Sequence, residues 1–307
     1  MRCAKGCAKD TPMMNRRGFI KNTAPVLVVL MVIAAIWYIA AVILNTPFQK
    51  DIYARAKVEN WTTLQLIRDT MAQKRPVLPA PHQVFAEIYK TTVLKKITSK
   101  RSLIYHSWVT LSSTLLGFLI GSVLGILLAV GIIHSRTLDK SLMPWVISSQ
   151  TIPILAVAPM IIVVLNAIGI QGLLPKAFIS TYLAFFPVTV GMVKGFRSPR
   201  VLHLDLMRTY SASRWQVFWK LRWPAALPYL FASMKIAISI ALVGAIVGEL
   251  PTGAVAGLGA RLLAGSYYGQ TIQIWSALVM AAILAGVLVT AVGYVNHLVN
   301  RRMGASS

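Results

Sequence analysis

Long apolar stretches separated by basic loops constrain the fold of this chain more than any other feature. Windows with few or no charges cover residues 24–44, 103–133, 143–165, 175–193, 229–248 and 271–295. A helix of about 20 apolar residues crosses the hydrocarbon core of a bilayer, whereas strands of a transmembrane barrel are about ten residues long and alternate in polarity. The sequence therefore predicts an all-α, polytopic integral membrane protein with about six transmembrane helices.

The composition supports that class. Hydrophobic residues make up 56% of the chain and charged residues only 13%, and the mean hydropathy is +0.66. Soluble domains carry about 25% charged residues. The formal charge of +23 is spread over loops without the fingerprint of a nucleic-acid domain, so it predicts contact with anionic membrane lipid and no nucleic-acid partner.

The basic residues predict the orientation, because lysine and arginine in short loops stay on the cytoplasmic side. They gather before the first window and after the second, fourth and sixth windows. Both termini are therefore expected in the cytoplasm. The expected segments are a basic leader (1–23), a first transmembrane helix (24–44), an external segment (45–102), a transmembrane domain (103–297) with a cytoplasmic loop (196–228), and a tail (298–307).

Two N-terminal segments admit more than one interpretation. The first apolar window is too long for the core of a signal peptide, about 7–15 residues, so we expect an anchor. The external segment holds about eleven basic residues and predicts a soluble helix at 52–72 before a proline-interrupted stretch at 76–81. We interpret it as a lid or interfacial helix, and a solvated spacer is the alternative.

The sequence contains no recognisable catalytic or metal-binding pattern. Only Glu249 among eight acidic residues lies close to a predicted span, and the five histidines are scattered. Cys3 and Cys7 lack partners at zinc-ligand spacing, and the phosphate-binding pattern G-x-x-x-x-G-K-[ST] is absent. The sequence predicts no enzyme activity, metal or cofactor for this chain.

Small residues and prolines recur inside the predicted spans. Glycines spaced four residues apart place small faces on two helices, which lets helix backbones approach closely, within one subunit or between two copies. We favour packing within the subunit. These glycines are Gly117, Gly121, Gly125, Gly244 and Gly248. Pro153, Pro159 and Pro187 are expected to bend the third and fourth spans.

The cytoplasmic loop is too apolar for a free linker and too short to cross a membrane. Ser198-Pro199 predicts a helix start, and Ser213 with Gln216 predicts a capping box and a second start. Pro224 is expected to stop the second helix near Arg222. The apolar side chains between these points need a partner surface, either on the chain's own helices or on another protein.

At this loop the chain resembles the permease subunits of binding-protein-dependent ABC importers, whose pattern is EAA, three residues, Gly, nine residues, I-x-L-P. Here the pattern reads Asp205-Leu206-Met207, then Ser211, then Leu221-Arg222-Trp223-Pro224. Leu78-Pro79-Ala80-Pro81 resembles the Leu-Pro-x-Pro start of the transmembrane domain in the nitrate, sulfonate and taurine branch. The similarity covers roughly residues 78–304. It implies the MetI-like ABC permease fold in the bacterial inner membrane.

The resemblance also implies partners. These are two cytoplasmic ATPase subunits that use ATP and Mg²⁺, an extracytoplasmic solute-binding protein, and a second permease copy, identical or paralogous. It implies that part of the loop contacts the ATPase. The residues are Asp205, Leu206, Met207, Tyr210, Ser211, Ala212, Ser213, Trp215, Phe218, Leu221 and Pro224. Ser211 departs from the usual glycine, and a residue with a Cβ is strained there if the turn needs a positive φ.

The substrate is less constrained. Sulfonates, nitrate, pyrimidine precursors and riboflavin all occur in the resembling branch, and the stretch around Glu249 is similar to the heterocycle importers. Glu249, Gly253 and Gly257 are candidates for the mouth of the pathway. An ion pair between Glu249 and Arg261 that fixes the loop is equally compatible with the sequence.

Other functional classes fit less well. A secondary transporter or channel would work without an ATPase, but usually carries ionisable residues inside its spans. Lys235 is the main one here. A membrane-embedded enzyme would need a convergent polar site, which is not legible.

Overall fold

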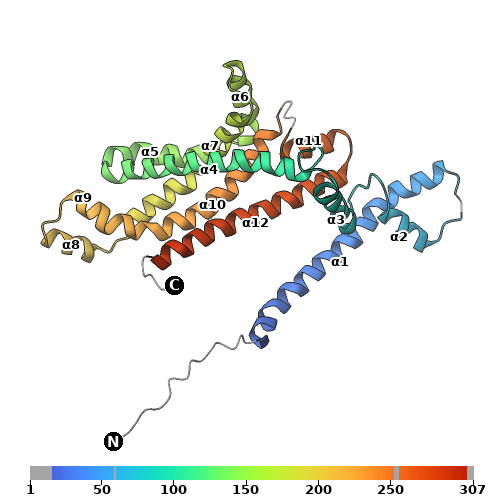
Figure 1. Cartoon of the computed structure of the whole chain (residues 1–307), viewed down its shortest axis with the longest axis horizontal. Coiled ribbons are helices and arrows are strands. Elements are labelled where there is room, and N and C mark those ends of the chain that lie inside the picture. The colour runs from blue at the N-terminus through green and yellow to red at the C-terminus, as the bar shows by residue number, and fades with distance from the viewer. Residues whose placement is uncertain (1–15, 59, 252–255, 303–307) are drawn as a thin grey trace, which may run out of the picture. The chain divides into compact units, whose positions relative to one another are not determined.

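The computed structural model describes residues 16–302 except 59 and 252–255, with the backbone alone for 16–24. Cys3, Cys7 and Gly253 lie outside the described residues. The chain divides into two compact units, Met1–Gln83 and Val84–Ser307, and every described regular element is helical (Figure 1).

The first unit pairs a long helix with a short one. α1 (Arg16–Arg55) extends well beyond the predicted anchor at 24–44, and α2 (Thr63–Met71) packs against it. The predicted helix at 52–72 is wrong, because the chain leaves helical geometry between the two elements and Lys57 has a φ of 52°. Asn45 connects α1 to the chain that follows α2. Its side-chain amide donates to Leu78 O at 2.8 Å, and its Oδ1 accepts from Val77 N at 2.7 Å.

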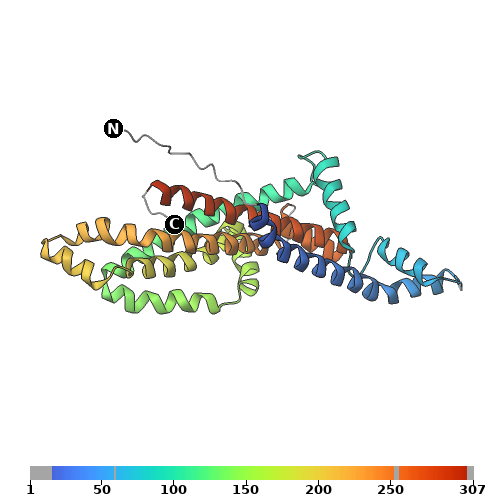
Figure 2. The same cartoon turned by 90° about the horizontal axis from the view of Figure 1, so that it is seen from below.

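The second unit is built on three helices in mutual contact. α4 (Leu103–His134) and α10 (Trp223–Glu249) both pack along α7 (Leu173–Phe196), and α12 (Thr271–Arg302) lies beside α10. Figure 2 shows these helices running side by side. α3 (Pro81–Tyr89), which crosses the boundary between the units, and the π-helical turn η1 (Lys90–Leu94) precede α4.

Glycines allow the close approach of α4 and α7. A Cβ added at Gly121 would lie 2.9 Å from the Ala184 Cβ, and one added at Gly125 would lie 2.8 Å from the Phe185 carbonyl oxygen. Gly117, Gly244 and Gly248 also face α7. All five glycines therefore contact a helix of the same chain.

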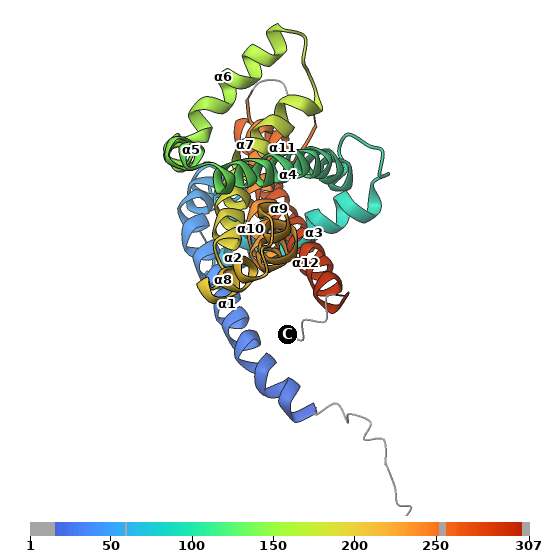
Figure 3. The same ribbon diagram turned by 90° about the vertical axis from the view of Figure 1, so that its left-hand side faces the viewer.

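The predicted third span is a broken helix. α5 (Arg136–Ser148) continues into a 3₁₀ turn, η2 (Ser149–Thr151), and α6 (Ile154–Ala167) then departs at a bend of 99°. Figure 3 shows α6 leaving the direction of α5. Pro153 explains the break, because proline forces the preceding residue out of helical geometry and Ile152 has a ψ of 121°. Five described helices are long and apolar enough to span a membrane, or six if the bent pair counts as one span.

One end of this unit carries residues 196–228, the loop that was predicted to be cytoplasmic. α8 (Val201–Thr209) and α9 (Arg214–Val217) form two short helices, and the π-helical turn η3 (Phe218–Arg222) joins α9 directly to α10. The predicted start at Ser198-Pro199 is wrong by two residues, since Arg200 is the N-cap of α8.

The predicted stop near Arg222 is also wrong. Pro224 lies in the first turn of α10, and the helical path runs from Arg214 to Glu249 over 36 residues. A π-helical turn changes the pattern of backbone hydrogen bonds, which accommodates a proline without an N–H in a continuous path. At the opposite end, α11 (Leu258–Tyr267) lies between α10 and α12.

Candidate functional site

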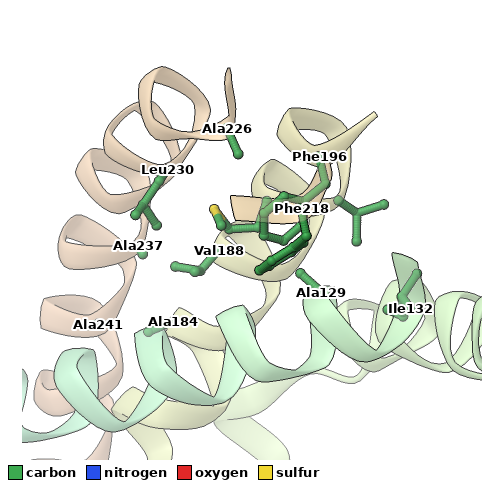
Figure 4. Close-up of a cluster of buried hydrophobic side chains, with 12 residues drawn as sticks. Ala129, Ile132, Ala184, Val188, Phe196, Phe218, Ala226, Leu230, Ala237 and Ala241 are labelled. Carbon is green, nitrogen blue, oxygen red and sulfur yellow. The ribbon is translucent and has the colours of Figure 1, made fainter. Parts of the chain in front are cut away.

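Phe218 fixes the loop to the helical bundle. Its side chain is 3% exposed and belongs to the main buried cluster, with Ala129, Val188 and Phe196. The Phe218 ring lies 5.3 Å from the Phe196 ring and 6.1 Å from that of Trp223 between centroids. Figure 4 shows Phe218 among side chains from α4 and α7. Phe218 therefore packs inside this chain and leaves little surface for a contact with an ATPase, which stays a prediction.

The other face of the loop is apolar and exposed. Trp215 is 64% exposed and Tyr210 is 77% exposed. We call this surface the docking face; it consists of Val201, Leu202, Leu206, Tyr210, Trp215 and Trp219. Six large apolar side chains exposed on one loop exceed the isolated exposed apolar residues that are normal on protein surfaces.

The same loop lines a basic cavity of about 390 Å³. Arg208, Arg214 and Arg222 line it together with Leu204 and Ala212. Arg208 also pairs with Asp205 at 3.0 Å, in a contact that is largely open to solvent. The lining of the cavity thus contains three arginines and no acidic side chain.

The turn between α8 and α9 holds the one residue that departs most from the importer pattern. Ser211 has a φ of 52°, the left-handed region that glycine adopts without strain. Ser213 caps α9 as predicted: its hydroxyl accepts from Gln216 N at 3.3 Å, and its own N–H donates to Gln216 Oε1 at 2.9 Å.

The remaining predicted loop residues are spread over the same region. Met207, Ala212 and Leu221 are half-buried, and Asp205 and Pro224 are exposed. The structure thus brings these residues of the resemblance together on one loop, with some turned toward the chain and others toward solvent.

At the opposite end, Glu249 is fully buried and holds the start of α11. The Thr110 hydroxyl lies 2.9 Å from Glu249 Oε2 and 3.0 Å from Oε1, and Gly259 N donates to Oε2 at 2.9 Å. The ammonium group of Lys176 lies 3.7 Å from Oε1. Glu249 therefore pairs with Lys176, and the expected ion pair with Arg261 is corrected.

His106 and a second contact of Thr110 complete this arrangement. Gly257 N donates to His106 Nδ1 at 3.0 Å, and Leu258 N donates to Thr110 Oγ1 at 2.9 Å. Three consecutive amides at the start of α11, which has no earlier carbonyls of its own to bond, are thus capped by α4 and α10. We call the group His106, Thr110, Lys176 and Glu249 the α11 clamp.

Gly257 is adapted to the clamp. Its φ is +129°, and a Cβ at this position would overlap the carboxyl group of Glu249. Gly257 and Glu249 are candidates from the sequence, whereas His106, Thr110 and Lys176 are not, because they are distant in the chain. The spacing of His106 and Thr110, one turn apart at the start of a span, was the available signal.

The described residues offer no metal site. No group of three or more histidine, cysteine, aspartate or glutamate side chains in the described part of the chain is arranged to hold an ion.

Comparison with known proteins decides the family. Residues 121–305 match the family of binding-protein-dependent transport system inner membrane components. The chain belongs to this family. The resemblance of the loop pattern to ABC importer permeases is thereby confirmed.

Relatives of this ABC permease agree with that assignment. A probable ABC transporter permease protein of Haemophilus influenzae is 30% identical over 71% of this chain and 86% of its own length. The formylaminopyrimidine transport permease protein ThiX of Halalkalibacterium halodurans is 32% identical over 60% of this chain and 68% of its own. The riboflavin transport system permease protein RibX of Chloroflexus aurantiacus is 32% identical over 73% and 80%, respectively.

A solved structure confirms the fold. An inward-facing form of the MetNI methionine ABC transporter contains a chain that aligns with a TM-score of 0.55 at 21% identity, over 62% of this permease and 93% of that chain. The protein is accordingly an importer-type ABC permease with the MetI-like fold.

Proposed function

We propose that this permease couples an ATPase to solute import through the docking face. One observation carries the proposal: an exposed apolar surface lies at the start of a helical path that ends at the α11 clamp. The path from Arg214 to Glu249 comprises 36 residues, which corresponds to roughly 54 Å at 1.5 Å per residue. A displacement at Trp215 would therefore be transmitted as a rigid-body movement to the opposite end.

The proposed complex contains three kinds of partner. Two ATPase subunits bind ATP and Mg²⁺, and a groove of the ATPase contacts the docking face. Acidic side chains of the ATPase lie opposite the three arginines of the basic cavity. A second permease copy, identical or paralogous, completes the pathway, and an extracytoplasmic binding protein delivers the solute. ATP binding changes the conformation only insofar as it favours one state over the other.

The proposed orientation places the docking face and both termini in the cytoplasm of the cell, with the permease in the inner membrane. The support is the positive-inside rule, since basic residues are abundant in the loop that contains α8 and α9. The α11 clamp then lies on the external side. There Glu249 has a structural function and does not contact solute, because its side chain is fully buried.

For the substrate we propose a small nitrogen heterocycle of the pyrimidine-precursor or riboflavin type. The relatives named for formylaminopyrimidine and riboflavin are each 32% identical to this chain, whereas those named for aliphatic sulfonates and nitrate are 25% identical. Uptake of labelled pyrimidine precursor, riboflavin and an alkane sulfonate by the reconstituted complex tests the substrate class. ATP-dependent uptake of the sulfonate alone would refute the heterocycle assignment.

Replacing Trp215 tests the coupling. The tagged Trp215→Asp variant should insert normally but lose its ATPase on purification in mild detergent, because a carboxylate would be buried in an apolar groove. The matched control is Tyr267→Asp, which changes an aromatic side chain that is 80% exposed at the other end of the unit. The proposal is wrong if the Trp215 variant retains a stoichiometric ATPase and full transport. If the wild-type chain carries no ATPase, an ATPase-independent transporter is favoured instead.

A further inference from the structure

A second basic cavity lies at the end of the unit that carries α11. Its volume is about 500 Å³, and four basic side chains face one acidic side chain in its lining. Lys90, Lys95 and Arg101 come from the segment before α4, and Arg261 comes from α11; the acidic residue is Glu87. Gln270, Gln273 and Tyr268 add polar groups to the wall.

The guanidinium group of Arg261 contains a buried nitrogen without a hydrogen-bond acceptor among the described residues. Its Nε atom is buried and has no hydrogen-bond partner in the described part of the chain, and the ion pairs found among the described residues do not include it. Burial lowers the pKa of Arg261; Glu87 opposes this effect, and Arg101 lowers the pKa further. The cavity therefore holds Arg101 and Arg261 near each other, and the charge of Glu87 offsets theirs only in part.

The position of Arg261 is fixed by the start of α11. It lies in the first turn of α11, where Arg261 N donates to the Gly257 carbonyl oxygen at 3.2 Å, and the α11 clamp fixes that turn from α4 and α10. Arg101 lies two residues before the first residue of α4. The two arginines are thus positioned by separate elements, which makes their proximity a property of the folded unit.

The cavity lies where helices that span the membrane begin. α4 starts at Leu103 and α12 starts at Thr271, and the neighbouring Tyr267 and Tyr268 are largely exposed. Exposed tyrosines next to span ends are typical of the headgroup level of a bilayer. Arginine forks match the oxygens of a phosphate group, and a cavity at the headgroup level lies where phospholipids present such groups.

We propose that this cavity binds a phosphate group, with Arg101 and Arg261 as its main ligands. An anionic phospholipid headgroup and free phosphate present the same chemistry. The volume and the position next to the span ends favour the phospholipid.

The test measures retention of lipid by the whole chain. The permease is transferred from nanodiscs of phosphatidylglycerol and phosphatidylcholine into mild detergent, and bound lipid is counted by native mass spectrometry. Arg101→Gln and the double variant with Arg261→Gln should lose phosphatidylglycerol by about tenfold or more, the order expected for a lost charge-assisted hydrogen bond. The control is Arg301→Gln with Arg302→Gln, which removes the same charge at the exposed end of α12.

Arg101→Gln keeps the test independent of folding, since Arg101 is exposed. Titration with inorganic phosphate in phosphatidylcholine discs identifies the source. Selective lipid retention that phosphate does not displace supports a phospholipid, and Arg101-dependent binding of phosphate supports a soluble ligand. Equal lipid retention by all variants together with no phosphate binding would overturn the proposal.

Discussion

Glu249 shows how much one buried residue can determine at the residue scale. Its carboxylate joins α4, α7, α10 and α11 through Thr110, Lys176 and Gly259. The sequence predicted that this lone carboxylate near a span is important, because ionisable groups are rare there. It did not predict Thr110 and Lys176 as partners, because they come from helices more than seventy residues away in the chain.

Replacing Glu249 with glutamine should destabilise the permease by about 2–3 kcal/mol, since Lys176 loses its counterion inside the protein. Thermal unfolding in detergent measures the loss. The control, Asp205→Asn, removes an exposed ion pair with Arg208 and should change stability by less than about 1 kcal/mol. Association with the ATPase should be unchanged in the Glu249 variant. Equal stability of the two variants would show that the α11 clamp is unimportant.

Gly257 allows a steric test of the same clamp. Gly257→Ala should lower stability by about 2–4 kcal/mol, because the added methyl group meets the carboxyl group of Glu249 in addition to the strain of a positive φ. Gly169→Ala is the matched control: its φ is +84°, but nothing lies within 4 Å of the added Cβ. If both variants unfold at the same temperature, only the backbone conformation matters at Gly257.

Ser211 is a position where the family's usual residue should improve stability. Ser211→Gly relieves the strain of a φ of 52°, and the expected gain is up to about 1 kcal/mol after the extra flexibility of glycine in the unfolded chain is deducted. Ser213→Ala, two residues away, should instead lose about 1 kcal/mol because the cap of α9 is removed. Chemical unfolding compares the two; a loss of stability in the glycine variant would contradict this reasoning.

At the scale of elements, the sequence predicted long straight spans better than their interruptions. Four of the predicted windows lie within α4, α7, α10 and α12, and the first lies within α1. The failures occur at prolines, where local preference and packing compete. Pro153 breaks a helix that was expected to continue, whereas Pro224 lies in a continuous helix that was expected to stop, because the adjoining π-helical turn accommodates it.

The glycine face of α4 gives the element-scale prediction. Gly121→Leu should push α4 away from α7 and lower stability by about 3 kcal/mol, since the added side chain meets Ala184 and the backbone of α7. Gly286→Leu in α12 is the control, because nothing lies within 4 Å of its added Cβ. Thermal unfolding of both variants in one detergent measures the difference. Equal loss in both would mean that the close contact of α4 and α7 is dispensable.

At the scale of the whole molecule, the sequence predicted an apolar loop that needs a partner surface, either on the chain's own helices or on another protein, but did not distinguish the two for any side chain. Phe218 and Trp215 are three residues apart and equally aromatic, yet the first is buried and the second is exposed. The difference in burial comes from tertiary packing, because η3 places Phe218 against residues of α4 and α7. The loop thus combines a buried anchor with the docking face that we propose for the ATPase, an arrangement suited to rigid-body transmission.

Hydrogen–deuterium exchange tests that account most directly. The permease is compared free and bound to its ATPase, and exchange of backbone amides is followed across the described chain. We expect the amides of residues 201–217 to exchange at least about tenfold more slowly in the complex, whereas those of α11 stay unchanged. Unaltered exchange at 201–217 with the ATPase stably bound would show that the ATPase docks elsewhere.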